Sequence, residues 1–289
     1  MIQKQKAKRE ILKNSTISKS DITSIAIGGF DGIHLGHQAL IDKLDINGAL
    51  LVIDKGNSNI TPKNYRKNFV ISPIYYYQIQ NIKHLMPQEF MNLLKSDFPK
   101  LRKIIVGYDF RFGKNRSCNF ECFRKNFDEV EIVEEVKLNS ISIHSKEIRE
   151  AIKQGDMTLS KDFLGRNYSI EGEQIEGQGV GKKSLFATIN LTIKEFLLPK
   201  NGVYASITKL NNQKYNSITF VGIRESTDNN FAIETHLLDL NDIDIESKID
   251  VEFVSFLRKN QKFNSLETLK KQIKIDIEKA KERLCISQN

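Results

Sequence analysis

Short apolar runs alternate with amphipathic stretches through the first half of the chain. The apolar runs have the length of buried strands, and the stretches between them place apolar residues three and four positions apart, as on one face of a helix. This alternation is typical of βα units that build a mostly parallel sheet. The expected strands are residues 24–27, 49–53, 103–106 and 130–133, and the expected helices are residues 36–44, 89–94 and 145–154. The first half therefore predicts a Rossmann-like α/β domain.

After about residue 157 the pattern changes to short runs in which apolar and polar residues alternate, separated by Gly, Asn and Asp. These runs predict a small antiparallel β-barrel. They are residues 168–173, 187–192, 202–208, 217–222, 232–239 and 248–256. Residues 265–284 then carry apolar side chains at helical spacing and predict a C-terminal helix. Because 289 residues also exceed a typical single domain, we expect two domains, residues 1–157 and 158–289.

Composition and charge narrow the class of protein. Hydrophobic residues make up 39% of the chain and charged residues 28%, which is enough apolar material for packed cores. Lys and Arg outnumber Asp and Glu by 44 to 36, and this excess favours phosphorylated small molecules. The basic first twenty residues are interpreted as a solvated segment, in preference to a nucleic-acid-binding one. No apolar run reaches the roughly 20 residues of a membrane-spanning helix, and no export signal is visible, so we expect a cytoplasmic protein.

The cysteines change this picture little. Cys118, Cys122 and Cys285 are too few and too unevenly spaced for a disulfide framework, so we expect free thiols in a reducing compartment. Cys118 and Cys122 have the spacing to open a zinc site, but no second Cys/His pair lies nearby at ligand spacing. The sequence therefore predicts no zinc.

A segment rich in glycine and histidine follows the first expected strand. Residues 27–38 are Ile-Gly-Gly-Phe-Asp-Gly-Ile-His-Leu-Gly-His-Gln and lead into the first expected helix. Glycines let the backbone approach a nucleotide closely, and a helix N-terminus offers N–H groups to phosphate. We expect His34 and His37 to be catalytic, stabilising charge that develops on an α-phosphate. An ordinary turn beside a core histidine is the alternative. The expected nucleotide contacts here are Gly28, Gly29, Phe30, Asp31 and Gly32.

This segment resembles the HxGH motif of the nucleotidylyltransferase superfamily, in the GGFDGxHxGHQ form of bacterial bifunctional riboflavin kinase/FMN adenylyltransferases. Residues 106–113, Val-Gly-Tyr-Asp-Phe-Arg-Phe-Gly, are similar to that family's VGxDFRFG segment. The resemblance implies that Asp109 and Arg111 help to hold ATP and flavin. Ser145 and Arg149 resemble the end of its SSTxIR motif and are expected to meet the nucleotide phosphates, Arg149 as a catalytic residue. A serine at a helix start and an arginine one turn later can indeed reach one anion.

The second half carries a glycine-rich loop, residues 177–183, that alone could equally be a hairpin with solvated lysines. Its resemblance to the GxGxxLGFPTAN region of riboflavin kinase implies nucleotide binding by Gly179, Gly181 and Lys182. The same resemblance assigns Mg²⁺ to Thr188 and Asn190, whose hard oxygen atoms suit that ion. Residues 233–239, Ile-Glu-Thr-His-Leu-Leu-Asp, look like the family's VEVHLLDF strand and make Glu234 the catalytic base. A solvent-facing strand glutamate is the alternative.

Three segments depart from the family pattern. Lys55-Gly56-Asn57 stands where the family has part of FxPHP, so the flavin side of the first site is expected to differ. His144 and Lys146 replace the first Ser and the Thr of SSTxIR. Residues 184–190 keep Thr188 and Asn190 but lack a Gly and a Pro of LGFPTAN, which alters the loop before them.

The sequence therefore predicts a bifunctional enzyme. The C-terminal module converts riboflavin and ATP to FMN, and the N-terminal module converts FMN and ATP to FAD and pyrophosphate, with Mg²⁺ as cofactor. The expected partners are ATP, riboflavin and FMN, with neither nucleic acid nor membrane. Three alternatives remain open: only one module turns over, the scaffold is a non-catalytic flavin- or RNA-binding protein, or a nucleotide is transferred to another phosphate, as in pantetheine or nicotinate mononucleotide enzymes.

Overall fold

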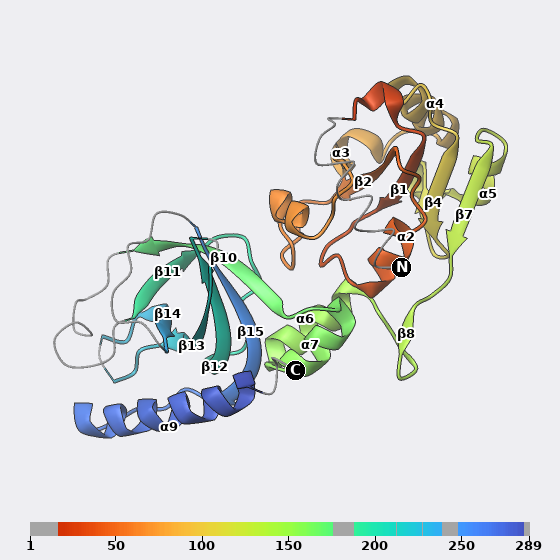
Figure 1. Ribbon diagram of the computed structural model, residues 1–289. Helices are drawn as coiled ribbons and strands as arrows, with labels where there is room; N and C mark the ends of the chain where they lie inside the picture. Colours follow the sequence, from red (N-terminus) through yellow and green to blue (C-terminus); the bar gives the residue numbers. More distant parts are fainter. Residues whose placement is uncertain (1–16, 176–187, 212, 227, 239–247, 286–289) are drawn as a thin grey trace. The chain divides into compact units, whose positions relative to one another are not determined.

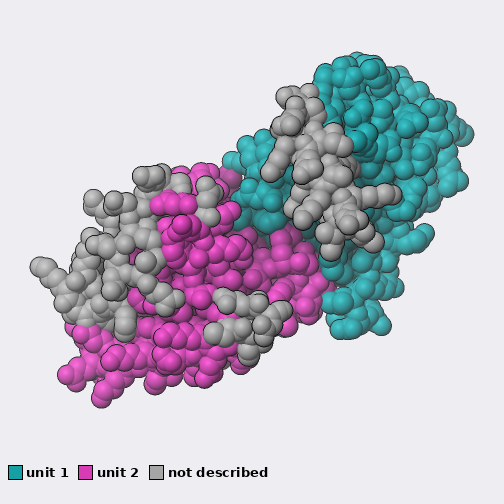
Figure 2. All heavy atoms as spheres, in the orientation of Figure 1, with its two compact units in different colours: residues 1–145 teal, residues 146–289 magenta. Residues whose placement is uncertain are grey.

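The computed structural model describes residues 17–175, 188–211, 213–226, 228–238 and 248–285. The chain divides into two compact units, residues 1–145 and 146–289, which are coloured separately in Figure 2. This division falls twelve residues before the expected domain boundary at 157, a boundary that stays a prediction. Two helices, α6 (Ser145–Gln154) and α7 (Met157–Leu164), lie mainly in the second unit.

The first unit is built on a five-stranded parallel sheet in the order β3-β2-β1-β4-β7 (Figure 1). Its strands are β1 (Ser24–Gly28), β2 (Gly48–Asp54), β3 (Ile74–Gln78), β4 (Lys103–Gly107) and β7 (Glu129–Val133). The four strands expected from the sequence are confirmed, and β3 is additional. The chain leaves β1 toward β2 on one side and later pairs β4 on the other side, so the order reverses at β1. Ligands of open parallel sheets bind at such a reversal, beyond the carboxyl ends of the strands.

Both faces of this sheet are covered, which explains why the buried stretches of its central strands β1, β2 and β4 are continuously apolar. Ile25, Ile27 and Leu51 enter one core, while Ala26 and Leu50 enter the other. The helices of this unit are α2 (Leu35–Ile41), α3 (Ile79–Ile82), α4 (Pro87–Asp97) and α5 (Glu121–Arg124), with short 3-10 helices η1 (Lys19–Asp21), η2 (Lys63–Asn68) and η3 (Lys114–Arg116). Two small hairpins complete it, β5 (Arg111–Phe112) with β6 (Cys118–Asn119) and β8 (Lys137–Leu138) with β9 (Ile141–Ser142).

The second unit is a closed antiparallel barrel in the order β10-β11-β14-β13-β12-β15 (Figure 1). Its strands are β10 (Tyr168–Ile175), β11 (Ile189–Ile193), β12 (Gly202–Leu210), β13 (Gln213–Ile223), β14 (Phe231–Leu237) and β15 (Ile249–Arg258). The C-terminal helix α9 (Leu266–Cys285) packs on the barrel through Ala280 and Leu284, which meet Ala205 and Ile218. The expected barrel and final helix are confirmed. Together with the parallel sheet of the first unit, they confirm the expected fold class.

The barrel interior contains a ring of five hydroxyl groups. Ser206, Thr208, Ser217, Thr219 and Thr235 are all fully buried. Each oxygen lies 2.8 to 3.0 Å from two others, in the order 206, 217, 208, 235, 219 and back to 206. Because Ala205 and Ile218 alternate with these residues and face α9, the hydroxyls lie on the inner face of strands β12 to β14. Buried hydroxyls are tolerated here because each has partners.

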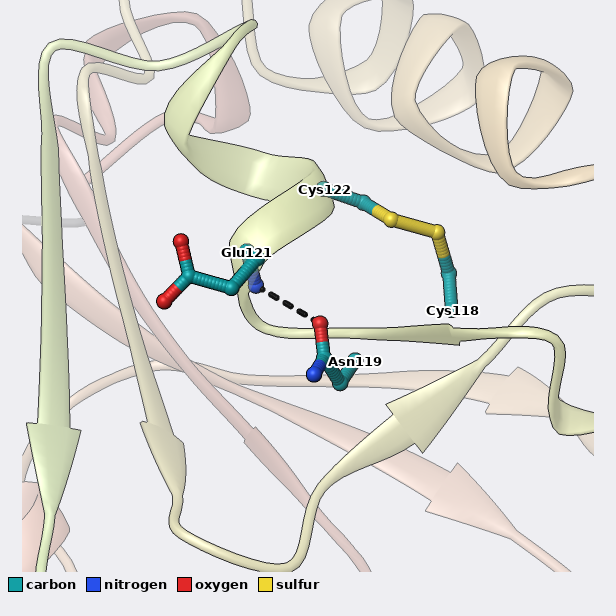
Figure 3. The surroundings of a disulfide bond; sticks show 4 residues. All are labelled: Cys118, Asn119, Glu121 and Cys122. Atoms are coloured by element: carbon teal, nitrogen blue, oxygen red, sulfur yellow. Dashed lines mark hydrogen bonds between the residues drawn. A yellow bond between two sulfur atoms is a disulfide. The ribbon is translucent and has the colours of Figure 1, made fainter.

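The expectation of free thiols is wrong for two of the three cysteines. Cys118 and Cys122 form a disulfide, with Cα atoms 6.2 Å apart (Figure 3). The chain turns from β6 into α5 between them, and the Asn119 Oδ1 atom accepts a hydrogen bond from the Glu121 N–H at 3.0 Å. That turn brings the two side chains together at a Cα separation usual for disulfides. The number and spacing of the cysteines in the sequence do not reveal this local geometry.

Among the residues that the structure describes, no helix is long and apolar enough to cross a membrane.

Candidate functional site

The glycine- and histidine-rich segment lies where strand β1 gives way to helix α2. Strand β1 ends at Gly28 and α2 begins at Leu35, so the loop leaves the carboxyl end of the central strand. Three of its residues have left-handed backbones: Phe30 at φ 48°, Ile33 at φ 41° and Gly32 at φ 95°. A left-handed backbone is costly for phenylalanine and isoleucine, so the surrounding contacts must hold the loop in this shape.

Asp31 and Thr61 hold the loop against the segment after β2. The Asp31 carboxylate is 5% exposed and accepts hydrogen bonds from the N–H groups of Ile60 and Thr61, at 3.0 and 2.9 Å. The Thr61 Oγ1 atom in turn accepts from the Gly32 N–H at 2.7 Å. The Ser145 hydroxyl donates to the Asp31 carbonyl at 2.7 Å. Asp31 therefore stabilises the loop through its carboxylate, and a nucleotide contact by Asp31 stays a prediction.

His34 and His37 are stacked at the start of α2. Their ring centroids are 3.6 Å apart, with 22° between the planes. The His34 Nδ1 atom accepts a hydrogen bond from the His37 backbone N–H at 3.3 Å and so caps the helix. Because this acceptor nitrogen carries no proton, the neutral His34 ring has its proton on Nε2. The helix cap therefore sets His34 to donate a hydrogen bond from Nε2.

A cavity of about 850 Å³ opens over this loop. This volume lies within the usual range for small-molecule sites. The predicted site residues on its wall are Gly28, Gly29, His34, His37, Asp109, Arg111 and Ser145. Phe30, Asp31 and Gly32 are buried behind the wall and do not line it. Basic side chains also line it, among them Lys55, Lys83 and Lys114, and they favour an anionic ligand. Lys55 belongs to the segment that departs from FxPHP.

Glu135 is a cavity residue that the sequence analysis missed. Its carboxylate accepts hydrogen bonds from the hydroxyls of Ser142 and of Tyr108, the latter at 3.2 Å, and pairs with Lys137 at 2.7 Å. The hydrogen bonds from Lys137 and Ser142 lower the pKa of Glu135 to about 2. Glu135 therefore joins the Tyr108 segment to the β8–β9 hairpin. No motif marked this residue, because its contact with Tyr108, 27 positions away, arises only in the folded chain.

Arg149 lies on α6, four residues after Ser145. Ser145 belongs to the first unit and Arg149 to the second. The expected contact of Arg149 with the nucleotide phosphates stays a prediction.

The second group of predicted residues lies on strands β11 and β14 of the barrel. Asn190 and Glu234 are directly opposite each other in the antiparallel pairing of these strands. Side chains of directly opposed residues share one face of the sheet, so the amide and the carboxylate project to the same side. Thr188 is exposed just before β11. The predicted nucleotide residues Gly179, Gly181 and Lys182 lie outside the described residues.

An arginine that the sequence analysis did not single out contacts Glu234. The Arg224 Nη1 atom lies 3.0 Å from Glu234 Oε1, and Arg224 Nη2 lies 2.8 Å from Asp228 Oδ2. Burial raises the pKa of Glu234, while the Arg224 charge opposes this rise. A carboxylate of raised pKa on a face shared with an amide oxygen is suited to accept a proton near neutral pH.

The matches to known protein families divide the chain in the same way. The family model described as FAD synthetase matches residues 16–49 and 74–147, and the one described as riboflavin kinase matches residues 164–284. The bifunctional riboflavin kinase/FMN adenylyltransferase of Buchnera aphidicola subsp. Schizaphis graminum is 31% identical, over 89% of this chain and 92% of that protein. The protein of the same description from Escherichia coli (strain K12) is 26% identical, over 87% of this chain and 90% of that protein.

A solved structure described as a macrolide-efflux protein from Streptococcus pneumoniae is also similar. It has a TM-score of 0.77 at 24% identity and covers 93% of this chain and 96% of that one. At this identity the likeness concerns the fold alone.

A Rossmann-like module with an HxGH loop, followed by a kinase-type barrel, defines a two-module transferase that uses nucleotides. The chain belongs to the bifunctional riboflavin kinase/FMN adenylyltransferase family. Its N-terminal module is the FMN adenylyltransferase and its C-terminal module the riboflavin kinase.

Proposed function

We propose that adenylyl transfer takes place in the cavity above residues 28–37. An oxygen of the FMN phosphate attacks the α-phosphorus of ATP, and pyrophosphate leaves. The attacking phosphate is already ionised at neutral pH, so no general base is needed. His34 and His37 donate hydrogen bonds to the charge that builds up on the α-phosphate. The observation that carries this proposal is the stacked histidine pair on the cavity wall, with Nδ1 of His34 committed to the helix cap.

Asp109, Arg111 and Ser145 are the proposed nucleotide and flavin contacts, because all three line the same cavity. Ser145 also ties the start of α6 to the carbonyl of Asp31, so its position depends on the shape of the phosphate loop. Arg149 remains the proposed cation for the nucleotide phosphates.

Phosphoryl transfer is proposed for the barrel face that carries Asn190 and Glu234. Glu234 accepts the proton of the ribityl 5′-hydroxyl as its oxygen attacks the γ-phosphorus of ATP, and ADP leaves. The direct pairing of Asn190 with Glu234 supports this proposal, because it puts the base beside the expected metal ligand.

Mg²⁺ is the proposed cofactor of this barrel site. Within the described ranges, no group of three or more His, Cys, Asp or Glu side chains is placed to hold a metal ion. The hydroxyl of Thr188 and the amide oxygen of Asn190 would hold it instead, which suits an ion that keeps several waters and binds substrate phosphates. When bound, Mg²⁺ neutralises charge on the transferred phosphoryl group. The substrates ATP, riboflavin and FMN and a cytoplasmic location belong to the same proposal.

Incubation of the purified protein with riboflavin and ATP tests both sites together. With Mg²⁺ present, chromatography should show FMN first and FAD afterwards, and an excess of EDTA should suppress both products. FMN without FAD would mean that only the barrel module turns over. Failure to form either product with Mg²⁺ would contradict the proposal.

A further inference from the structure

Arg66 lies behind the phosphate loop and takes no part in the cavity wall. It belongs to η2 (Lys63–Asn68), in the segment between β2 and β3, and is 1% exposed. The FAD synthetase family model matches residues 16–49 and 74–147 and therefore leaves out the segment that contains Arg66.

The guanidinium group of Arg66 holds the backbone of the loop. Its Nε atom donates to the Phe30 carbonyl at 3.0 Å, and Nη2 lies 3.5 Å from the Gly29 carbonyl. Its Nη1 atom donates to the Lys63 carbonyl within η2 at 3.2 Å. The Tyr76 ring lies 5.9 Å from the guanidinium carbon, and the Tyr76 hydroxyl donates to the same Lys63 carbonyl. One side chain thus joins η2 to two successive peptide groups of the loop.

These contacts fix the orientation of the loop N–H groups. In a trans peptide the carbonyl and the N–H of one peptide group point in opposite directions. Since Arg66 attracts the carbonyls of Gly29 and Phe30, it turns the N–H groups of Phe30 and Asp31 away from itself. It also holds Phe30 in its left-handed backbone at φ 48°. Without the hydrogen bonds from Arg66, fewer contacts offset the energetic cost of the left-handed backbone at Phe30.

Arg66 also brings a buried positive charge to the loop. Among the described residues, no carboxylate forms an ion pair with its guanidinium; the acceptors are backbone carbonyls. The pKa of Asp54 is lowered by a hydrogen bond from the Gly56 N–H and, to a smaller extent, by the charge of Arg66, so this carboxylate offsets part of that charge. The remainder contributes positive potential to the phosphate loop.

We propose that Arg66 is a positioning residue for adenylyl transfer, holding the phosphate loop in its binding shape and lending it positive charge. This inference rests on the proposed function of the loop containing His34 and His37. Arg66 acts through the carbonyls of Gly29 and Phe30, and the ATP triphosphate is the ligand whose binding and reaction depend on it.

The test compares Arg66→Met with Lys67→Met. Lys67 is the exposed neighbour of Arg66, so its substitution removes the same formal charge without disturbing the loop. FAD formation from supplied FMN is measured across ATP concentrations, and riboflavin kinase activity of the same preparations reports on the integrity of the rest of the chain. In Arg66→Met, kcat/KM for ATP in FAD formation should fall about 10- to 100-fold, as expected for losing hydrogen bonds from a charged donor. Riboflavin phosphorylation should stay unchanged, and Lys67→Met should keep both activities.

Arg66→Lys separates charge from geometry. Lysine keeps the charge but cannot reach two carbonyls as a fork. In this variant KM for ATP should stay close to that of the parent, while kcat falls about fivefold or more. If Arg66→Met unfolds the first module, the kcat of Arg66→Lys in FAD formation provides the test instead. A parent-like kcat in Arg66→Lys, or an Arg66→Met no weaker than Lys67→Met, would overturn the inference. If His37→Ala also left FAD formation intact, the proposed function itself would be wrong, which distinguishes the two failures.

Discussion

Arg224 and Glu234 form an ion pair in which Nη1 lies 3.0 Å from Oε1. Arg224 begins the turn between β13 and β14, and Glu234 lies on β14, so the pair closes the end of this hairpin. The second arm of the guanidinium pairs with Asp228, 2.8 Å away. The proposed catalytic base is therefore held in place by a cation that is itself held by a second carboxylate.

This pairing predicts the pH dependence of FMN formation. Glu234 accepts a proton only when ionised, and burial raises its pKa above the ordinary value of 4.5, while Arg224 lowers it. Activity should therefore fall as the pH drops through the folded pKa. In Arg224→Met the lowering influence is gone, so the acid limb of kcat should move to higher pH. A pH profile of riboflavin phosphorylation measures this, with FAD formation by the same variant as control. An acid limb that stayed in place or moved to lower pH would contradict the assignment.

Glu234→Gln should nearly abolish FMN formation. Glutamine keeps the shape of the side chain and can still meet Arg224 through its amide oxygen, but it cannot take the proton. Loss of a general base typically costs about 100-fold to 10,000-fold, and the loss should lie in kcat more than in riboflavin affinity. Steady-state kinetics of both reactions check this, since FAD formation from supplied FMN should be unaffected. A glutamine variant as fast as the parent would remove Glu234 from the mechanism.

His37→Ala should slow FAD formation and leave FMN formation intact, which is the reverse of the effect expected for Glu234→Gln. Removing one of the two stacked donors should slow FAD formation by about 100-fold or more. FMN formation from riboflavin should persist, because the barrel site belongs to the other unit. Product analysis of one reaction mixture, started from riboflavin, should then show FMN accumulating without FAD. Equal loss of both products would argue against two independent sites.

The disulfide between Cys118 and Cys122 should influence stability and leave catalysis unchanged. It closes a loop of five residues, counting both cysteines, so its entropic stabilisation of the folded state is about 2 kcal/mol. Replacing both cysteines by serine should lower the free energy of unfolding by that amount under oxidising conditions and have little effect with a reductant present. Denaturant unfolding with and without dithiothreitol measures the difference. Both activities should match the parent, and stoichiometric zinc in the purified parent would contradict this interpretation.

The regular elements followed from the sequence more readily than the contacts between them. Strands β1, β2 and β4 contain continuous apolar runs, and β7 alternates Glu and Val before ending in Ile132 and Val133. Local pattern analysis detects both patterns. Strand β3 escaped detection because Tyr75, Tyr76 and Tyr77 and their neighbours are neither strictly alternating nor deeply buried.

The same limit applies to the two sites. The histidines and glycines of residues 27–38 could be recognised from the local sequence, but the side chains that hold them in place could not. Arg66 meets Phe30 from 36 positions away, and Glu135 meets Tyr108 from 27 positions away. Nothing in the local pattern marks such residues, because their importance arises only when the fold brings distant segments together. Arg224 is closer to Glu234 in sequence, but only the hairpin turn brings the two side chains together. In the sequence alone, Arg224 cannot be distinguished from an exposed arginine.

The hydroxyl ring in the barrel constrains how its sequence can vary. Each of Ser206, Thr208, Ser217, Thr219 and Thr235 has one hydrogen to give. Thr235 has a further acceptor in the Ile218 carbonyl at 3.4 Å, but in the complete ring each hydroxyl gives to one neighbour and receives from the other. The hydrogens therefore circulate in one of two opposite senses, and reversal requires all of them to turn together. Loss of any single oxygen leaves a stranded donor and a stranded acceptor in a dry interior. A substitution that removes one of these hydroxyls should therefore be tolerated better when a neighbouring hydroxyl is replaced together with it.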